Sequence, residues 1–173
     1  MGADRTVMGL NFPQKDVPGV LMPPPILYLA ALIVGVLLDY AIPQGNPLGG
    51  AAPLIGIAAL FVGAYGLYWV KSTLDKAGTP INPRRPTTAL VTDGPFQYSR
   101  NPAYICLSLI YLGLALLIGG MITLVFLPVV VWIMIWGVIE LEEAYLERKF
   151  GAQYLDYKAR VPRWLRFSRP TRP

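Results

Sequence analysis

The chain has 173 residues, of which 54% are hydrophobic and 14% are charged, and its net charge is +5. The mean hydropathy of +0.48 is far from the balance of a soluble domain of this length, so we expect an integral membrane protein. The single cysteine excludes an intrachain disulfide. Because the basic residues follow the membrane edge, we expect no nucleic acid as a partner. We also expect no metal.

The first apolar stretches cover residues 26–42 and 51–70, after 25 polar and proline-rich residues in which we expect no cleavable signal peptide. Each approaches the roughly 20 helical residues that cross a bilayer core. Asp39 lies near the outer end of the first stretch, where its charge can reach water. The second stretch has small residues at four-residue spacings, which suit close helix packing within the bundle or in a dimer: Ala52, Gly56, Ala59 and Gly63.

The third apolar stretch, residues 104–139, is too long for one span and is interrupted by Gly119 and Gly120. We predict two short helices joined by a tight turn there. The expected fold is therefore an all-α integral membrane protein with about four transmembrane helices, the last two of which form a helical hairpin. Cys106 lies at the start of this stretch, which suits a packed thiol better than a nucleophile.

Four spans place both termini and the loop of residues 71–100 on one side of the membrane. The basic residues lie on that side, so we expect it to be cytoplasmic, in a bacterial or archaeal inner membrane. Anionic lipid headgroups are the expected partners of the basic C-terminal tail. That tail carries Arg160, Arg163, Arg166, Arg169 and Arg172.

The stretch VTDGPFQYSRNPAY, residues 91–104, ends this loop where an apolar helix begins. Prolines in residues 79–95 disfavour helix and predict an ordered connector over the bundle. Asn101 is expected to cap the helix that Pro102 opens, and the free N–H groups of its first turn, next to Arg100, suit an anion. An ordinary capped helix with an arginine that extends to the interface is the alternative.

An acidic segment continues the last apolar helix past the membrane. Its acids have no Lys or Arg three or four residues further along, so their partners must come from elsewhere: Glu140, Glu142, Glu143 and Glu147. Glu142 shares a helix side with Leu146 and should face the bundle, whereas Glu143 should point to another neighbour.

A carboxylate at Glu142 among apolar neighbours needs a cation or a donor. Arg100, the loop arginines Arg84 and Arg85, or a ligand with hydroxyl or ammonium groups could supply it. After Gly151, an aromatic run predicts a short amphipathic helix at the interface, which could form a lid.

The blocks TALVTDGPFQYSRNPAY and EEAYLERKFGAQYLDYKARVPR together resemble the isoprenylcysteine carboxyl methyltransferase family, a group of membrane-embedded enzymes that looks related to phospholipid methyltransferases. The resemblance covers roughly residues 79–163. It implies S-adenosyl-L-methionine as cofactor and one membrane-embedded domain over residues 1–173. Within it, residues 1–25 form a cytoplasmic segment, 26–70 two transmembrane helices, and 71–173 the cofactor-binding core.

The resemblance also implies which residues bind the cofactor. They are Thr88, Ala89, Leu90, Val91, Phe96, Asn101, Pro102, Ala103, Tyr104 and Glu142. Two positions depart from the family pattern: the histidine of the helix-opening motif is Asn101 here, and Val138 stands where the eukaryotic enzymes carry an arginine before the acidic run.

The predicted function is methyl transfer to a lipophilic acceptor that enters from the bilayer, either an isoprenylcysteine-like carboxylate or another lipid-soluble molecule. A carboxylate acceptor needs no general base, whereas an amine, alcohol or thiol must lose a proton. Glu143, Tyr104 and Arg100 are the candidate catalytic residues. The alternatives are a phospholipid amine N-methyltransferase, a small membrane exporter subunit and a catalytically inactive scaffold.

Overall fold

The computed structural model describes residues 16–20, 22–42, 49–82 and 84–165. In this part of the chain all regular structure is helical. The α-helices are α1 (Pro24–Ala41), α2 (Ala52–Lys76), α3 (Pro102–Ile118), α4 (Met121–Met134), α5 (Glu140–Phe150) and α6 (Ala152–Arg160). The 3-10 turns η1 (Gly49–Ala51) and η2 (Gly94–Gln97) and the π-helical segment η3 (Ile135–Ile139) complete the set.

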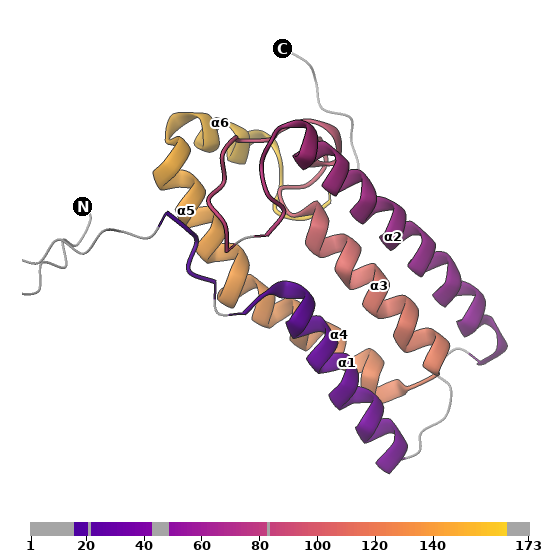
Figure 1. The fold of residues 1–173 in the computed structure, drawn as a ribbon. Coiled ribbons are helices and arrows are strands. Elements are labelled where there is room, and N and C mark those ends of the chain that lie inside the picture. The colour runs from indigo at the N-terminus through magenta and orange to yellow at the C-terminus, as the bar shows by residue number, and fades with distance from the viewer. Residues whose placement is uncertain (1–15, 21, 43–48, 83, 166–173) are drawn as a thin grey trace, which may run out of the picture.

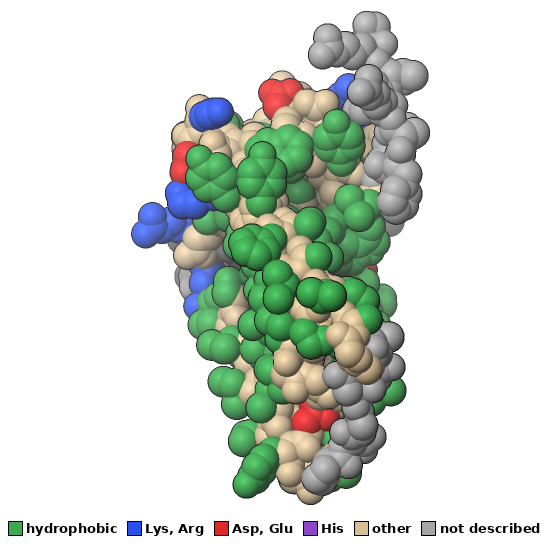
Figure 2. All heavy atoms as spheres, turned by 90° about the vertical axis from the view of Figure 1, so that its right-hand side faces the viewer, with side chains coloured by type: hydrophobic (Ala, Val, Ile, Leu, Met, Phe, Trp, Pro, Cys, Tyr) green, Lys and Arg blue, Asp and Glu red, His purple; other side chains and the backbone are tan. Residues whose placement is uncertain are grey.

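Three helical segments are long and apolar enough to cross a membrane: Pro24–Ala41, Gly49–Lys76 and Met121–Phe150. The fourth, α3, is apolar but has only 17 residues. In Figure 1, α3 lies between α2 and the pair formed by α1 and α4. Figure 2 shows hydrophobic side chains over the length of one face, with the Lys and Arg side chains gathered toward its upper end. The predicted fold class is confirmed.

Helix α2 packs on α3 through glycines. A Cβ atom at Gly56 would lie 2.8 Å from the carbonyl oxygen of Gly113, and one at Gly63 would lie 2.9 Å from that of Cys106. Both distances are shorter than real Cβ contacts, so side chains there would force the helices apart. The small residues of α2 thus serve packing within the bundle, and Cys106 is a buried packed thiol, as predicted.

The turn between α3 and α4 forms where the sequence predicts it. Gly119 has a φ of 77°, a left-handed conformation that ends α3 at low cost because glycine has no Cβ. The carboxylate of Asp39 accepts hydrogen bonds from the N–H groups of Ile122 and Thr123, each at 2.9 Å, at the start of α4. Asp39 therefore joins α1 to α4 as a helix cap.

Helix bounds differ from the predicted ones mainly near the polar end. Helix α1 begins within the proline triplet, and α2 runs to Lys76, six residues past the predicted end of its apolar stretch at Val70. Between α4 and α5 the chain takes five residues of π-helix, Ile135–Ile139, which the sequence analysis did not anticipate. Such segments often lie next to functional sites, because the extra residue per turn changes the direction of the side chains that follow.

Candidate functional site

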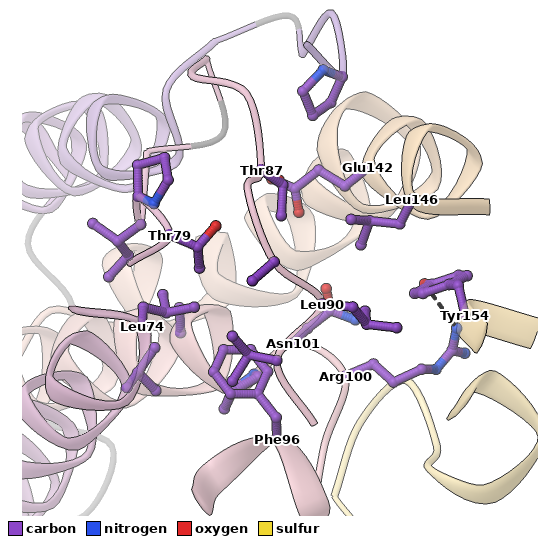
Figure 3. Close-up of a pocket in the computed structure, with 18 of the residues that line it drawn as sticks. Leu74, Thr79, Thr87, Leu90, Phe96, Arg100, Asn101, Glu142, Leu146 and Tyr154 are labelled. Carbon is purple, nitrogen blue, oxygen red and sulfur yellow. Dashed lines mark hydrogen bonds between the residues drawn. The ribbon is translucent and has the colours of Figure 1, made fainter. Parts of the chain in front are cut away.

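A pocket lies at the polar end of the bundle, where the loop between α2 and α3 meets α5 and α6 (Figure 3). It is lined by the C-terminal end of α2, by the loop, by the start of α3, and by residues of α5 and α6. Sequence segments 50 or more residues apart thus meet at one place. The connector predicted over the bundle occupies this position in Figure 1.

One side of the pocket is apolar. Val70 and Leu74 from the last turns of α2 lie near Phe96, while Leu90 and Leu146 contribute from the loop and from α5. Leu90, Phe96 and Leu146 also pack against the buried rings of α6. Such a surface suits a flat ring or another weakly hydrated group.

The loop contributes free backbone groups to the pocket. Ala89, Leu90 and Val91 line it, and in the described part of the chain their N–H and C=O groups make no hydrogen bond. The residues before them are fixed: the N–H of Thr87 donates to Tyr145 Oη at 3.1 Å, and the N–H of Thr88 to Thr79 Oγ1 at 3.0 Å. An anchored loop segment with unused backbone donors and acceptors is suited to bind a ligand.

Glu142 faces the pocket from α5 (Figure 3). Its Oε1 accepts a hydrogen bond of 2.7 Å from the hydroxyl of Tyr104 on α3. No Lys or Arg among the described residues forms an ion pair with it. The compensating cation proposed for Glu142 is thus wrong within the described chain: Arg100 pairs elsewhere, and Arg84 and Arg85 are exposed. A carboxylate with one neutral donor retains most of its acceptor capacity.

Glu143, the next residue, lies outside the pocket in a cluster of charges. Its carboxylate is 3.1 Å from Arg100 Nη1, and it accepts hydrogen bonds of 2.9 and 3.0 Å from Arg163 Nε and Nη2. Lys158 Nζ lies 3.8 Å away. Because the Glu143 side chain is only 7% exposed, this two-pronged pairing with Arg163 offsets the cost of its burial. The Glu143 carboxylate therefore stabilises the fold at this end of the bundle.

Arg100 connects the charge cluster to the pocket. Its guanidinium lines the pocket and pairs with Glu143, and Nη1 also lies 3.5 Å from Tyr154 Oη. Its Nε is buried and has no hydrogen-bond partner among the described residues. A buried donor without a partner costs free energy, so this N–H is available to an acceptor on a ligand.

Asn101 occupies the cap position of α3, but its side chain does not cap the helix, which corrects the sequence prediction. Its Nδ2 instead donates to the carbonyl oxygen of Arg163 at 3.2 Å, which also accepts from Ser99 Oγ at 3.0 Å. The backbone N–H of Arg100 bonds Pro162 O at 3.0 Å. The segment after α6 is thus tied to the start of α3.

Helix α6 closes another side of the pocket, at the position expected of a lid. Tyr154 and Tyr157 are buried and line the pocket, and Tyr157 Oη donates to Phe96 O at 2.8 Å. Burial, followed by the negative charge of Glu143, raises the pKa of Tyr154 to about 12. Burial also raises the pKa of Tyr157. Both hydroxyls are therefore neutral at physiological pH.

Nine of the ten predicted cofactor-binding residues line this pocket; Thr88 is the exception. The Thr88 hydroxyl donates to Gly78 O at 2.8 Å, away from the pocket. The sequence did not predict the contributions of Pro18, the α2 end, residues 79–81, Thr87 and Tyr145. The polar residues that continue α2 past its apolar stretch were the signal that could have predicted the contribution of the α2 end.

The family model described as phospholipid methyltransferase matches residues 52–153, more than half of the chain. The fold and the match define the class: the chain belongs to the phospholipid methyltransferase family. Several curated relatives that it matches are named protein-S-isoprenylcysteine O-methyltransferase, which confirms the resemblance predicted from the sequence.

The relative from Schizosaccharomyces pombe is 32% identical over 102 residues, covering 56% of this chain and 43% of the relative. The B form from Arabidopsis thaliana is 37% identical over 73 residues, 42% of this chain and 37% of the relative. The Mus musculus protein is 30% identical over 118 residues, 65% of this chain and 42% of the relative. The chain thus spans about two-fifths of the length of these relatives. No solved structure matches it significantly.

Proposed function

We propose that this protein is a membrane methyltransferase that uses S-adenosyl-L-methionine and acts on a lipophilic acceptor. One observation carries the proposal: Glu142, the unpaired backbone of residues 89–91 and the unpaired Nε of Arg100 meet in one pocket, at the polar end of a bundle of apolar helices. The family match and the names of the relatives support methyl transfer as the reaction.

The chemistry of the pocket fits this cofactor. The apolar side suits an adenine ring, and the backbone groups of Ala89 and Val91 can hydrogen-bond its edge. The Glu142 carboxylate can accept from ribose hydroxyls or from the ammonium group, and the Arg100 Nε–H can donate to the carboxylate. The volume of the pocket, about 140 Å³, is below the range of about 300–1,000 Å³ for small-molecule sites. The ligand therefore also needs the open side of the pocket or movement of the loop.

When bound, S-adenosylmethionine supplies an electrophilic methyl group on a sulfonium. The residues of this chain have three tasks. The loop and α6 hold the donor in one orientation, the apolar side excludes water, and Tyr104 keeps Glu142 in place through its hydroxyl. Alignment in a dry site can supply much of the acceleration of an in-line displacement, which neutralises charge as it proceeds.

Proton removal is required only for an amine, alcohol or thiol acceptor. Of the three candidate catalytic residues, Tyr104 and Arg100 line the pocket, whereas Glu143 does not and is held by two arginines. We therefore keep Tyr104 and Arg100 as candidates and no longer propose Glu143 as a base. Its place in the charge cluster gives it a positioning role toward Arg100.

The acceptor is an isoprenylcysteine-like carboxylate, after the names of the relatives, or another lipid-soluble molecule; the alternative is a phospholipid amine, after the name of the family model. Lipid extracts from cells with and without the gene separate the two. Methylated phospholipid headgroups that disappear with the gene would support the phospholipid alternative, and unchanged headgroups would support the first reading.

We further propose that the pocket end faces the cytoplasm, because the described Lys and Arg residues lie there. Of the tail arginines expected to contact anionic lipids, Arg163 is engaged by Glu143 and Arg160 Nε donates to Asp156 O at 3.2 Å. The other three lie outside the described residues. Reversing their charge and measuring binding to anionic nanodiscs tests that partnership.

The direct test of the proposed function is calorimetric titration of S-adenosylmethionine and S-adenosylhomocysteine into the purified protein in nanodiscs. Saturable binding of both ligands is expected, since the pocket groups bind the parts that they share. Absence of binding by a protein that unfolds cooperatively on heating would contradict the proposal and favour a catalytically inactive scaffold.

A further inference from the structure

A short segment ahead of α1, residues 16–20, lies against α5 (Figure 1). We name it the strap. Pro18 of the strap lines the pocket, and Val20 belongs to the buried core cluster that also contains Tyr104. The family model matches residues 52–153, so the strap lies outside the matched region. This chain thus adds to the wall of the pocket with residues that the family match does not include.

One side chain joins the strap to the loop of the pocket. Tyr145 of α5 lines the pocket and is only 3% exposed. Its Oη donates to Asp16 Oδ1 at 3.0 Å and accepts from the N–H of Thr87 at 3.1 Å and from Lys149 Nζ at 3.0 Å. A tyrosine hydroxyl has one hydrogen to donate and accepts at its oxygen. Its donor and its acceptor capacity are thus both used.

The strap and α5 together fix the direction of this hydroxyl. Lys149 Nζ also donates to Asp16 Oδ1 at 2.8 Å and to Oδ2 at 2.7 Å, so the three groups form one network. An ammonium can only donate and a carboxylate can only accept. The Tyr145 hydrogen must therefore point at Asp16, and a lone pair of its oxygen is left for the N–H of Thr87.

The hydrogen bond to Thr87 bears on the part of the loop that is open to a ligand. Thr87 stands two residues before residues 89–91, whose backbone groups line the pocket. The next N–H group, that of Thr88, is held within the loop by Thr79 Oγ1 at 3.0 Å. The loop is thus held toward α5 by Tyr145. Without that hold, residues 89–91 are free to move, and a ligand must order them when it binds.

We propose that Tyr145 is a positioning residue for the cofactor and that the strap acts through it. Asp16 and Lys149 orient the hydroxyl, the hydroxyl holds Thr87, and Thr87 sets the place of the backbone that meets the adenine ring. This assignment rests on the proposed function and deepens it, because it adds residues 16–20 to the cofactor site.

Hydrogen exchange of the full-length protein in nanodiscs, without ligand and at single-residue resolution, tests the hydrogen bond to the loop. Tyr145→Phe keeps the ring and removes the hydroxyl. Exchange of the Thr87 N–H should become about fivefold faster, which corresponds to about 1 kcal/mol for one hydrogen bond. Exchange of the Thr88 N–H should stay as in the wild type, because its acceptor is Thr79, and this also shows that the variant is folded.

The matched control is Tyr68→Phe, the same change on α2 at a side chain that is 70% exposed. Both N–H groups should exchange there as in the wild type. Unchanged exchange of Thr87 in Tyr145→Phe would overturn the proposal. Equal acceleration of Thr87 and Thr88 would overturn it too, since it would mean that the whole loop had loosened.

A double-mutant cycle tests whether the strap acts through Tyr145. Asp16→Ala alone should accelerate the exchange of Thr87 by a smaller factor, about twofold, since contacts of exposed charges contribute little. Added to Tyr145→Phe, it should change this exchange no further, because no hydroxyl remains to be oriented. The same factor in both backgrounds would overturn the link between the strap and the loop.

Calorimetric titration of the same proteins separates this proposal from the proposed function. The affinities for S-adenosylmethionine and S-adenosylhomocysteine, which share the adenine ring, should both fall about fivefold in Tyr145→Phe and stay unchanged in Tyr68→Phe. Unchanged affinities in Tyr145→Phe would overturn the positioning role and leave the proposed function intact. Absence of binding by the folded wild type would overturn the proposed function, and with it the role of Tyr145 toward the cofactor.

Discussion

Two sides of α5 carry the same kind of residue in opposite settings. On one side, Glu142 borders an open pocket and, among the described residues, receives one hydrogen bond, from Tyr104. On the other, Glu143 is buried against Arg100 and Arg163. The partners of a carboxylate, more than its presence in a motif, decide what it can do. The first has unused acceptor capacity for a ligand, and the second holds the fold of the polar end together.

The largest effect, a loss of stability, is expected when Glu143 is replaced. Glu143→Ala leaves two arginines without their buried partner, and breaking such a pair costs about 3–5 kcal/mol. We expect a pronounced drop in the thermal unfolding midpoint in nanodiscs, together with weaker cofactor binding because Arg100 is released. The matched control is Glu147→Ala, one turn further along α5, whose partner Lys158 lies near the surface.

Surface ion pairs contribute about 0–1 kcal/mol, so the control should unfold near the wild-type temperature. Equal midpoints for the two variants would contradict the structural role assigned to Glu143 and would make its side of α5 equivalent to an ordinary solvated surface.

A smaller effect, on cofactor affinity, is expected from a change at Tyr104, which lines the pocket. Tyr104→Phe removes the hydroxyl that fixes Glu142 but keeps the ring in the core. Loss of one hydrogen bond of about 1 kcal/mol corresponds to about a fivefold weaker affinity for S-adenosylmethionine. Calorimetry measures it. An unchanged affinity would indicate that Glu142 needs no positioning by Tyr104.

The smallest effect concerns an exposed contact of α5. Lys149 Nζ donates to Asp16 Oδ2 at 2.7 Å, and Tyr145 Oη donates to Asp16 Oδ1 at 3.0 Å. The hydrogen bond from Lys149, then that from Tyr145, lowers the pKa of Asp16 below its ordinary value of 3.8. A lowered folded pKa means that this contact stabilises fully above the ordinary value and is lost as pH falls through the lowered one.

Acidification below that value should therefore release residues 16–20 from α5. Hydrogen exchange of the buried Val20, corrected for intrinsic rates, measures this release. In Asp16→Asn the exchange should lack the acid transition. A transition of equal size in both proteins would contradict the role of Asp16.

Much of the fold follows from the sequence because its determinants are local. Apolar length fixes the spans, and Gly119 fixes the turn of the hairpin through its positive φ. The π-helical segment before α5 could not be predicted, since it depends on how α4 and α5 pack on their neighbours. Likewise, α2 continues to Lys76, past the apolar residues from which its span was predicted, so hydropathy alone does not give its end.

The sequence predicted many of the residues at the site, but not which of them form hydrogen bonds and ion pairs with one another. Helix periodicity correctly directed Glu142 toward the bundle and Glu143 elsewhere, and the resemblance selected nine of the 21 residues that line the pocket. Sequence alone could not assign the partners, because Arg100 and Arg163 reach Glu143 from segments 43 and 20 residues away. For the same reason the side chain of Asn101 bonds the carbonyl of Arg163 in place of capping α3.

The most direct test of the account is the affinity of S-adenosylmethionine for Glu142→Gln beside the wild type, with thermal unfolding measured on both. Glutamine keeps the shape and can still accept from Tyr104, so the unfolding midpoint should stay near that of the wild type. Loss of the charge should weaken binding at least tenfold, as expected for about 1.5–3 kcal/mol in a hydrogen bond to a charged group. Wild-type affinity in a folded Glu142→Gln protein would contradict the assignment of this pocket to the cofactor.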